Sequence, residues 1–258
     1  MNLKQKLDYH YNAFDRSKLE PDPLQFLHLF NDENDIEVMG LIASIFAYGS
    51  VKQIINSLNK IVEITKNEPY NFTRQFDFQK DKIKLIGLNH RFYTERDITH
   101  LFSLIQTAHG EFGSLKNLFS KGLDKNDENI KKGITNFSEY FLNSYKRKYG
   151  NFSNGIKFMF PLPQKGSACK RMNLFLRWMI RKDELDFGLW NEISPNKLII
   201  PVDTHIARIC KHLKLTNRKN VNWKMAEEIT GKLKRFDPVD PVKYDFALCH
   251  IGMRKLEF

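Results

Sequence analysis

Residues 201–213 read Pro-Val-Asp-Thr-His-Ile-Ala-Arg-Ile-Cys-Lys-His-Leu. In this segment an acidic residue, Asp203, stands where a helix is expected to begin. Apolar residues recur at three- and four-residue steps from Ile206 to Leu213, so the pattern predicts a helix over about 203–214. The free N–H groups at a helix start stabilise a carboxylate as the anion. Asp203 is therefore either a simple N-cap or a carboxylate kept ionised for chemistry.

A second segment, residues 161–173, reads Pro-Leu-Pro-Gln-Lys-Gly-Ser-Ala-Cys-Lys-Arg-Met-Asn, a Pro/Gly turn followed by a helical pattern. We expect a helix over about 167–182 with Ser167 as its N-cap, which places Lys170 in the first turn. The positive end of the helix dipole disfavours an ammonium there and lowers the lysine pKa, as an amine nucleophile requires. The alternative interpretation is that Lys170, Asn173, Arg177 and Arg181 form one solvated helix face.

Helical periodicity dominates the rest of the chain. The residues around Leu41 and around Leu58 predict two apolar-faced helices separated near 48–50, and Ile130 to Tyr145 predicts an amphipathic helix. Further helices are expected near 95–109, 222–235 and 241–252. Residues 181–196 are interpreted as an inserted helix and turn, and only 197–202 reads as extended. The predicted class is all-α.

Charge is distributed unevenly along the 258 residues. The net charge is +11, of which residues 157–258 contribute +9 and residues 1–156 only +2. A basic half suggests a surface for a polyanion, with nucleic acid as the leading candidate. A solvated surface that keeps the protein soluble is the equally weighted alternative.

Several classes of protein and site are not expected. The start of the chain has no apolar run of signal-peptide type, and the longest apolar stretch, 38–49, is too short to span a bilayer. We therefore expect a cytoplasmic protein without a membrane partner. Cys169, Cys210 and Cys249 are too few and too widely spaced for a disulfide framework, a zinc site or an iron–sulfur cluster. No metal or other cofactor is predicted.

Together the two segments resemble the helix-hairpin-helix DNA glycosylase superfamily. Residues 203–236, with Val-Asp-Thr-His-Ile-Ala-Arg-Ile-Cys at their start, resemble the endonuclease III group. Leu162-Pro163-x-x-Gly166 followed by Lys170-x-x-Asn173 resembles that group's hairpin. The hairpin is two residues longer here, and the 33-residue separation of Lys170 from Asp203 resembles the stretched arrangement of the archaeal oxoguanine glycosylases. The whole chain also resembles an uncharacterised bacterial family of this fold.

The resemblance implies a site and an activity. Lys170 would attack the sugar C1′ and Asp203 would assist, so that the protein removes a modified base from DNA as a bifunctional glycosylase and AP lyase. If Lys170 is not the nucleophile, Asp203 could activate water for simple base removal. The other readings are a catalytically inactive nucleic-acid-binding protein of the same fold and a helical protein whose basic half binds another anion.

The resemblance also implies DNA contacts and a two-domain architecture. Tyr48 would fill the gap left by a flipped base, with a core tyrosine as the alternative. The domains would be 28–182, ending in the hairpin and the Lys170 helix, and 1–27 joined to 183–258, carrying Asp203. No obligate protein partner is inferred, and the expected DNA is double-stranded with a damaged base. The residues expected to contact phosphates are Lys165, Gly166, Arg208, Lys211 and Lys214.

Overall fold

A computed structural model describes the backbone of residues 1–254 and the side chains of residues 1–249. Helices make up the regular structure of this range, which contains two isolated β-bridges and no β-strand, so the all-α class is confirmed. The chain divides into two compact units. Unit 1 comprises Met1–Leu19, Asn126–Lys131 and Leu162–Phe258, and unit 2 comprises Glu20–Lys125 and Lys132–Pro161.

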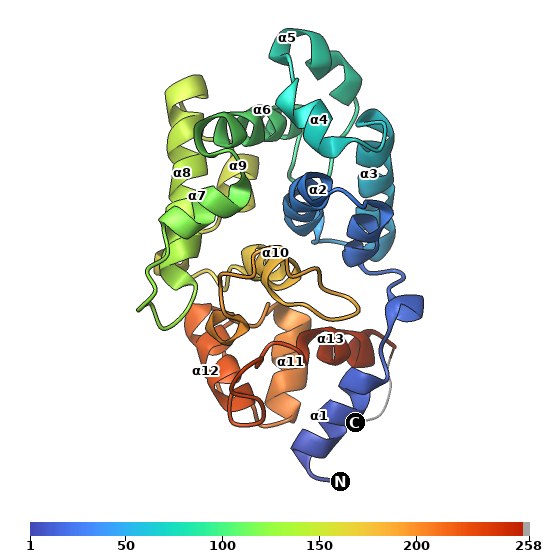
Figure 1. Cartoon of the computed structure of the whole chain (residues 1–258), viewed down its shortest axis with the longest axis vertical. Helices are drawn as coiled ribbons and strands as arrows, with labels where there is room; N and C mark the ends of the chain where they lie inside the picture. The colour runs from blue at the N-terminus through green and yellow to red at the C-terminus, as the bar shows by residue number, and fades with distance from the viewer. Residues whose placement is uncertain (255–258) are drawn as a thin grey trace. The chain divides into compact units, whose positions relative to one another are not determined.

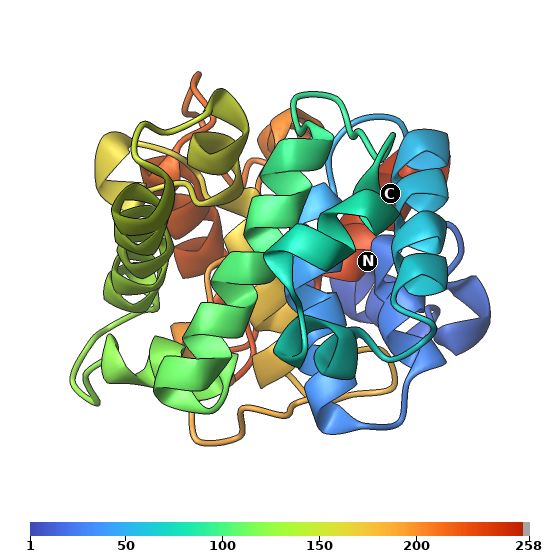
Figure 2. The ribbon, with the colours of Figure 1, turned by 90° about the horizontal axis from the view of Figure 1, so that it is seen from above.

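Unit 2 is built around α2 (Glu33–Phe46), whose residues from Ile36 to Phe46 are all buried. Asp32 caps this helix by accepting the amides of Asn34 and Asp35, and a helix that is apolar on every side must lie inside its unit. Helix α2 contacts α3 (Val51–Ile64) and α4 (Pro69–Arg74), and α4 in turn contacts α6 (Glu95–Phe112), as Figures 1 and 2 show. The remaining helices of the unit are α5 (Phe78–Asp81), α7 (Leu115–Lys121), α8 (Lys131–Tyr149) and α9 (Asn154–Met159).

Unit 1 holds the N-terminal and the C-terminal helices together. Its helices are α1 (Leu3–Asn12), α10 (Lys170–Ile180), α11 (Thr204–His212), α12 (Trp223–Leu233) and α13 (Asp245–Arg254). Helix α13 contacts both α1 and α11 (Figure 1). The unit's core includes three tryptophans, Trp178, Trp190 and Trp223, each almost fully buried.

The boundaries of the units differ from the expected domain boundaries. The sequence places the hairpin and the Lys170 helix in a domain ending at 182, whereas here residues from Leu162 onward belong to unit 1 with Asp203. Helix α10 belongs to unit 1 because Arg177 and Arg181 on this helix form ion pairs with acidic residues of the C-terminal part of the chain. The inserted helix expected in 181–196 is absent, because this segment forms turns and a loop up to the short 3₁₀ turn Pro195–Lys197.

No helix within residues 1–254 combines the length and the apolar character that crossing a membrane requires.

Candidate active site

Asp203 begins α11 as its N-cap. Its side chain accepts hydrogen bonds from the backbone N–H groups of His205 and Ile206, both at 2.9 Å. These two bonds satisfy amides that the helix itself leaves without partners. They also fix the carboxylate at the positive end of α11. Oδ1 accepts the two amides, and Oδ2 points away from them and can contact another group.

Lys170 lies in the first turn of α10, as the sequence predicts, but it is the first residue of the helix and Ser167 is not the N-cap. The residue before the helix is Cys169, which has a left-handed backbone (φ 49°) and makes no side-chain cap. Ser167 Oγ instead accepts the Cys169 amide at 3.1 Å, within the turn. The hairpin ahead of it is the short 3₁₀ turn Pro163–Lys165 followed by Gly166 with φ 84°, a conformation that favours glycine.

The structure brings Lys170 and Asp203 into contact within unit 1. Lys170 Nζ lies 2.8 Å from Asp203 Oδ2, and the side chains are 31% and 35% exposed. The two groups therefore form an ion pair that is partly buried and still reachable from solvent. An amine and a carboxylate at this distance can exchange a proton directly.

The ion pair reverses the pKa shift that the sequence suggests for Lys170. Burial lowers the pKa of Lys170, but the Asp203 carboxylate, with smaller contributions from Cys249 and Asp245, raises it, and the net pKa lies above its ordinary value. Burial raises the pKa of Asp203, while the Lys170 charge and the two capping amides lower it, and the net pKa lies below its ordinary value. The expected low lysine pKa is wrong for this state, because the effect of the carboxylate outweighs that of burial and of the helix dipole.

The polar side of α10 is buried and is not a solvated face. Asn173, Arg177 and Arg181 are at most 3% exposed. Arg177 pairs with Asp245 of α13 at 2.5 Å and with Asp186 at 3.3 Å. The solvated-face interpretation is therefore wrong for these three residues, and only Lys170 is accessible.

Arg181 extends this buried network. It binds Asp240 through Nε at 2.9 Å, Asp183 at 2.8 Å, and Asp186. Burial raises the pKa of Asp245 to about 6 against the opposing effect of Arg177, and that of Asp186 also lies above its ordinary value because of burial. The network holds α10, the 183–186 turn and α13 together beneath Lys170.

The residues expected to contact phosphates are exposed in unit 1. They lie on the hairpin (Lys165, Gly166) and along or after α11 (Arg208, Lys211, Lys214). A cavity of about 260 Å³ opens along α11 and is lined by Thr204, Ala207, Arg208, Lys211, Lys219 and Val221. No acidic side chain lines it, so the electrostatic environment favours an anion.

Tyr48 lies in unit 2 and is held by several partners. Its hydroxyl donates to His90 O at 2.8 Å and accepts from the Phe92 amide at 3.1 Å. Its ring stacks on Phe92 at 6.0 Å, and the Arg91 guanidinium lies 5.5 Å from the ring centre. These contacts favour a structural role for Tyr48, although the side chain remains half-buried.

Phe92 is a surface aromatic that sequence reasoning missed. It is 58% exposed, at a turn in which Arg91 adopts a left-handed backbone and the His90 and Tyr93 backbones bond to each other at 2.9 Å. An exposed phenyl ring beside a guanidinium offers a stacking surface for a base. The run Asn89-His90-Arg91-Phe92 carries a turn signal in sequence only through Asn89, which is too weak to predict an exposed ring.

The cysteines of the chain have no arrangement for metal binding. Cys169 and Cys210 are buried, and burial raises the pKa of each thiol to about 12. Over the part of the chain that the structure describes, no three His, Cys, Asp or Glu side chains gather where they could hold a metal ion.

Comparison with known proteins identifies a family and leaves the activity open. The model of the family described as "Protein of unknown function (DUF2400)" matches residues 22–254, so the chain belongs to that family. No curated protein and no solved structure matches the chain significantly.

Proposed function

We propose that this member of the DUF2400 family is a DNA glycosylase with AP lyase activity, in which Lys170 is the nucleophile and Asp203 its acid–base partner. The observation that carries the proposal is the 2.8 Å contact between an accessible amine and an accessible carboxylate, each at the start of its own helix. The sequence resemblance to the helix-hairpin-helix glycosylases supports the same assignment.

The reaction begins with a proton transfer from Lys170 Nζ to Asp203 Oδ2, because only the neutral amine has a lone pair to donate. The amine then attacks C1′ of the nucleotide and forms a bond between C1′ and Nζ while the glycosidic bond to the base breaks. The base leaves with its electron pair and takes up the proton held on Asp203. The C1′–O4′ bond of the sugar ring then breaks and O4′ takes up one proton from the attached Nζ, which leaves a Schiff base between C1′ and Lys170. Removal of a C2′ proton then expels the 3′ phosphate oxygen and cuts the strand.

The ion pair sets the resting protonation state. The raised pKa of Lys170 and the lowered pKa of Asp203 keep the proton on nitrogen in the unliganded protein. Bound DNA excludes water from the pair, which penalises the two charges and favours the neutral amine with the neutral acid. Substrate binding therefore activates the nucleophile in this scheme.

The target base must leave the duplex stack before C1′ is accessible. The exposed hairpin offers the Lys165 charge and a backbone that a phosphate can approach closely at Gly166. Arg208 and Lys211 add positive charge along α11, and Lys214 adds a further charge just after its end. Phosphate neutralisation by these groups would supply a salt-dependent share of the affinity.

Borohydride trapping tests the proposal. DNA duplexes that contain abasic sites or damaged bases are incubated with the full chain and a reductant, which converts a Schiff base into a stable covalent adduct. We expect an adduct with the wild-type protein and none with Lys170→Gln. The control Lys224→Gln removes another exposed lysine of unit 1, on α12, and should retain the adduct.

A second candidate is a monofunctional glycosylase in which Asp203 activates water and Lys170 only keeps the carboxylate ionised. The pKa directions favour this candidate, because they describe a lysine that holds its proton. Base release without a trapped adduct supports it. No base release and no adduct, with salt-dependent duplex binding, indicates a binding protein that lacks activity, and salt-independent binding argues against DNA as the ligand.

A further inference from the structure

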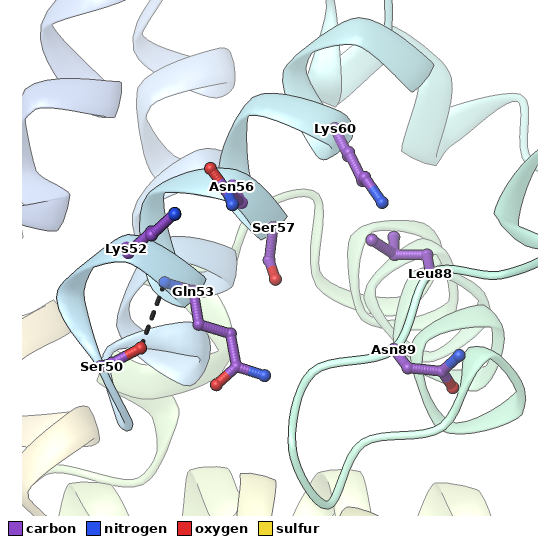
Figure 3. A pocket seen from close by; sticks show the side chains of 8 residues that line it. All are labelled: Ser50, Lys52, Gln53, Asn56, Ser57, Lys60, Leu88 and Asn89. Atoms are coloured by element: carbon purple, nitrogen blue, oxygen red, sulfur yellow. Dashed lines mark hydrogen bonds between the residues drawn. The ribbon is translucent and has the colours of Figure 1, made fainter.

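Unit 2 contains a polar pocket that the proposed chemistry does not use. It has a volume of about 390 Å³, within the roughly 300–1,000 Å³ range of small-molecule sites. One wall is the exposed face of α3 and the other is the loop at Leu88 and Asn89. Figure 3 shows Gln53, Ser57 and Lys60 extending from α3 towards that loop.

A chain of hydrogen bonds at the base of the pocket links its two walls. Ser57, which is 5% exposed, lies 3.0 Å from His90 Nδ1, and His90 Nε2 lies 3.0 Å from Tyr48 O. Because a carbonyl oxygen can only accept, Nε2 carries a proton, and in the neutral tautomer that this leaves Nδ1 accepts from the Ser57 hydroxyl. The helix wall and the loop wall are therefore tied together, and the pocket is preformed.

The rim of the pocket has unused hydrogen-bonding capacity. Within the described residues, no hydrogen bond or ion pair engages the side chains of Lys52, Gln53, Asn56 or Lys60, all of which are exposed. Asn89 is held in place because its Oδ1 accepts the Glu95 amide at 3.1 Å, which leaves its NH₂ group as a donor. Such donors and acceptors can bind a ligand without breaking any existing contact.

The chemistry of these walls selects the class of ligand. Two lysines and no acidic side chain line the pocket, and the N-terminus of α3, capped by Ser50, adds its partial positive charge, so an anion is favoured. Side-chain amides such as that of Gln53 form paired hydrogen bonds with base edges. Leu88 is the one apolar side chain of the lining and is only 3% exposed, so polar groups supply most of the contact surface.

We propose that this pocket binds a single nucleotide whose base lies outside a helical stack, with its phosphate at Lys60 and its base edge at Gln53 and Asn89. The site lies within unit 2 and does not depend on the chemistry of Lys170 and Asp203. The same nucleotide chemistry can come from a free nucleoside monophosphate or from an unpaired position in a strand.

Calorimetric titration of the full chain tests this proposal. The probes are the four deoxynucleoside 5′-monophosphates, inorganic phosphate, and a five-nucleotide single strand. We expect saturable binding of a monophosphate with a Kd of about 1 mM or lower, or tighter binding of the strand. Gln53→Ala and Lys60→Ala should each weaken that binding about tenfold, as expected for the loss of one or two hydrogen bonds or a charge contact.

Matched variants separate the possible outcomes. Asn59→Ala removes an exposed amide from α3 that does not line the pocket, so it should leave binding unchanged. Lys170→Gln should also leave it unchanged, so that loss of borohydride trapping and loss of this binding are independent results. The proposal is overturned if neither the monophosphates nor the strand bind, if phosphate alone binds as tightly as they do, or if Gln53→Ala and Asn59→Ala behave alike.

Discussion

Asp203→Asn separates the two roles of this residue, helix cap and acid–base partner. Asparagine caps helices about as well as aspartate, so its side-chain oxygen can still accept the amides of His205 and Ile206. What the variant loses is the charge. The partly exposed ion pair with Lys170 contributes about 0–1 kcal/mol after solvent screening, and the charge on the helix dipole about 0.3–1 kcal/mol.

The expected loss of stability is therefore about 1 kcal/mol, which lowers Tm by about 4 °C for a unit of this size. Loss of a general acid–base group costs about 10²–10⁴-fold in rate. The assays are thermal unfolding and single-turnover base release with trapping. Asp32→Asn, which changes the N-cap of α2 in unit 2, is the control and should alter neither measurement much.

Two results would refute this reasoning. Retention of near wild-type base release and trapping by Asp203→Asn would reduce Asp203 to a helix cap. A fall in stability above about 3 kcal/mol would mean that the charge is far less solvent-screened than its 35% exposure implies. A third variant, Asp203→Ala, removes the cap as well and should cost about 1 kcal/mol more than Asp203→Asn.

Three further predictions follow from the same geometry. Arg177→Met leaves buried Asp186 and Asp245 without this partner and should lower the free energy of unfolding by about 3–5 kcal/mol in urea denaturation; a change below about 1 kcal/mol contradicts the assigned burial. The trapping rate should change little through the neutral range, because the proton that leaves Lys170 passes to Asp203 within the pair and is not lost to solvent. A trapping rate that rises about tenfold per pH unit through this range would mean that the amine loses its proton to solvent, which contradicts the transfer to Asp203. The stability that this lysine adds is a separate expectation: it is present below the unfolded-state pKa and is lost as pH rises through the raised folded-state pKa. Lys165→Ala and Arg208→Ala should each reduce the slope of log affinity against log salt by about 1; an unchanged slope removes that residue from the DNA contacts.

Periodicity predicted most of the helices of the site region because local apolar spacing decides them. The helix expected over 203–214 is observed as Thr204–His212, and that expected over 95–109 as Glu95–Phe112. The first residue of α10 is harder to predict. The local sequence suggests Ser167 as the N-cap, but the residue before the helix is Cys169, which has a left-handed backbone. A left-handed non-glycine residue depends on its surroundings and carries no sequence signal.

The contact between Lys170 and Asp203 was expected only through the resemblance, since no local rule relates residues 33 positions apart. The burial of Arg177 and Arg181 was not foreseen for a similar reason. Their acidic partners on the C-terminal side are Asp245, 68 residues away, and Asp240, 59 residues away. In sequence, arginines at helical spacing with Lys170 look like a solvated face, because charged residues are seldom buried unless they are paired.

The buried arginines also explain how a single accessible lysine can be held at a defined position. Successive residues of an α-helix are rotated by about 100°, so Arg177, seven residues after Lys170, lies on nearly the same side of α10. Rotation of α10 would pull Arg177 from Asp245 and Asp186 and leave buried charges unpaired. The ion-pair network therefore fixes the orientation of α10, and through it the direction in which Lys170 meets Asp203. Burying these charges costs desolvation free energy. Holding Lys170 in position to meet Asp203 is a function that accounts for this cost.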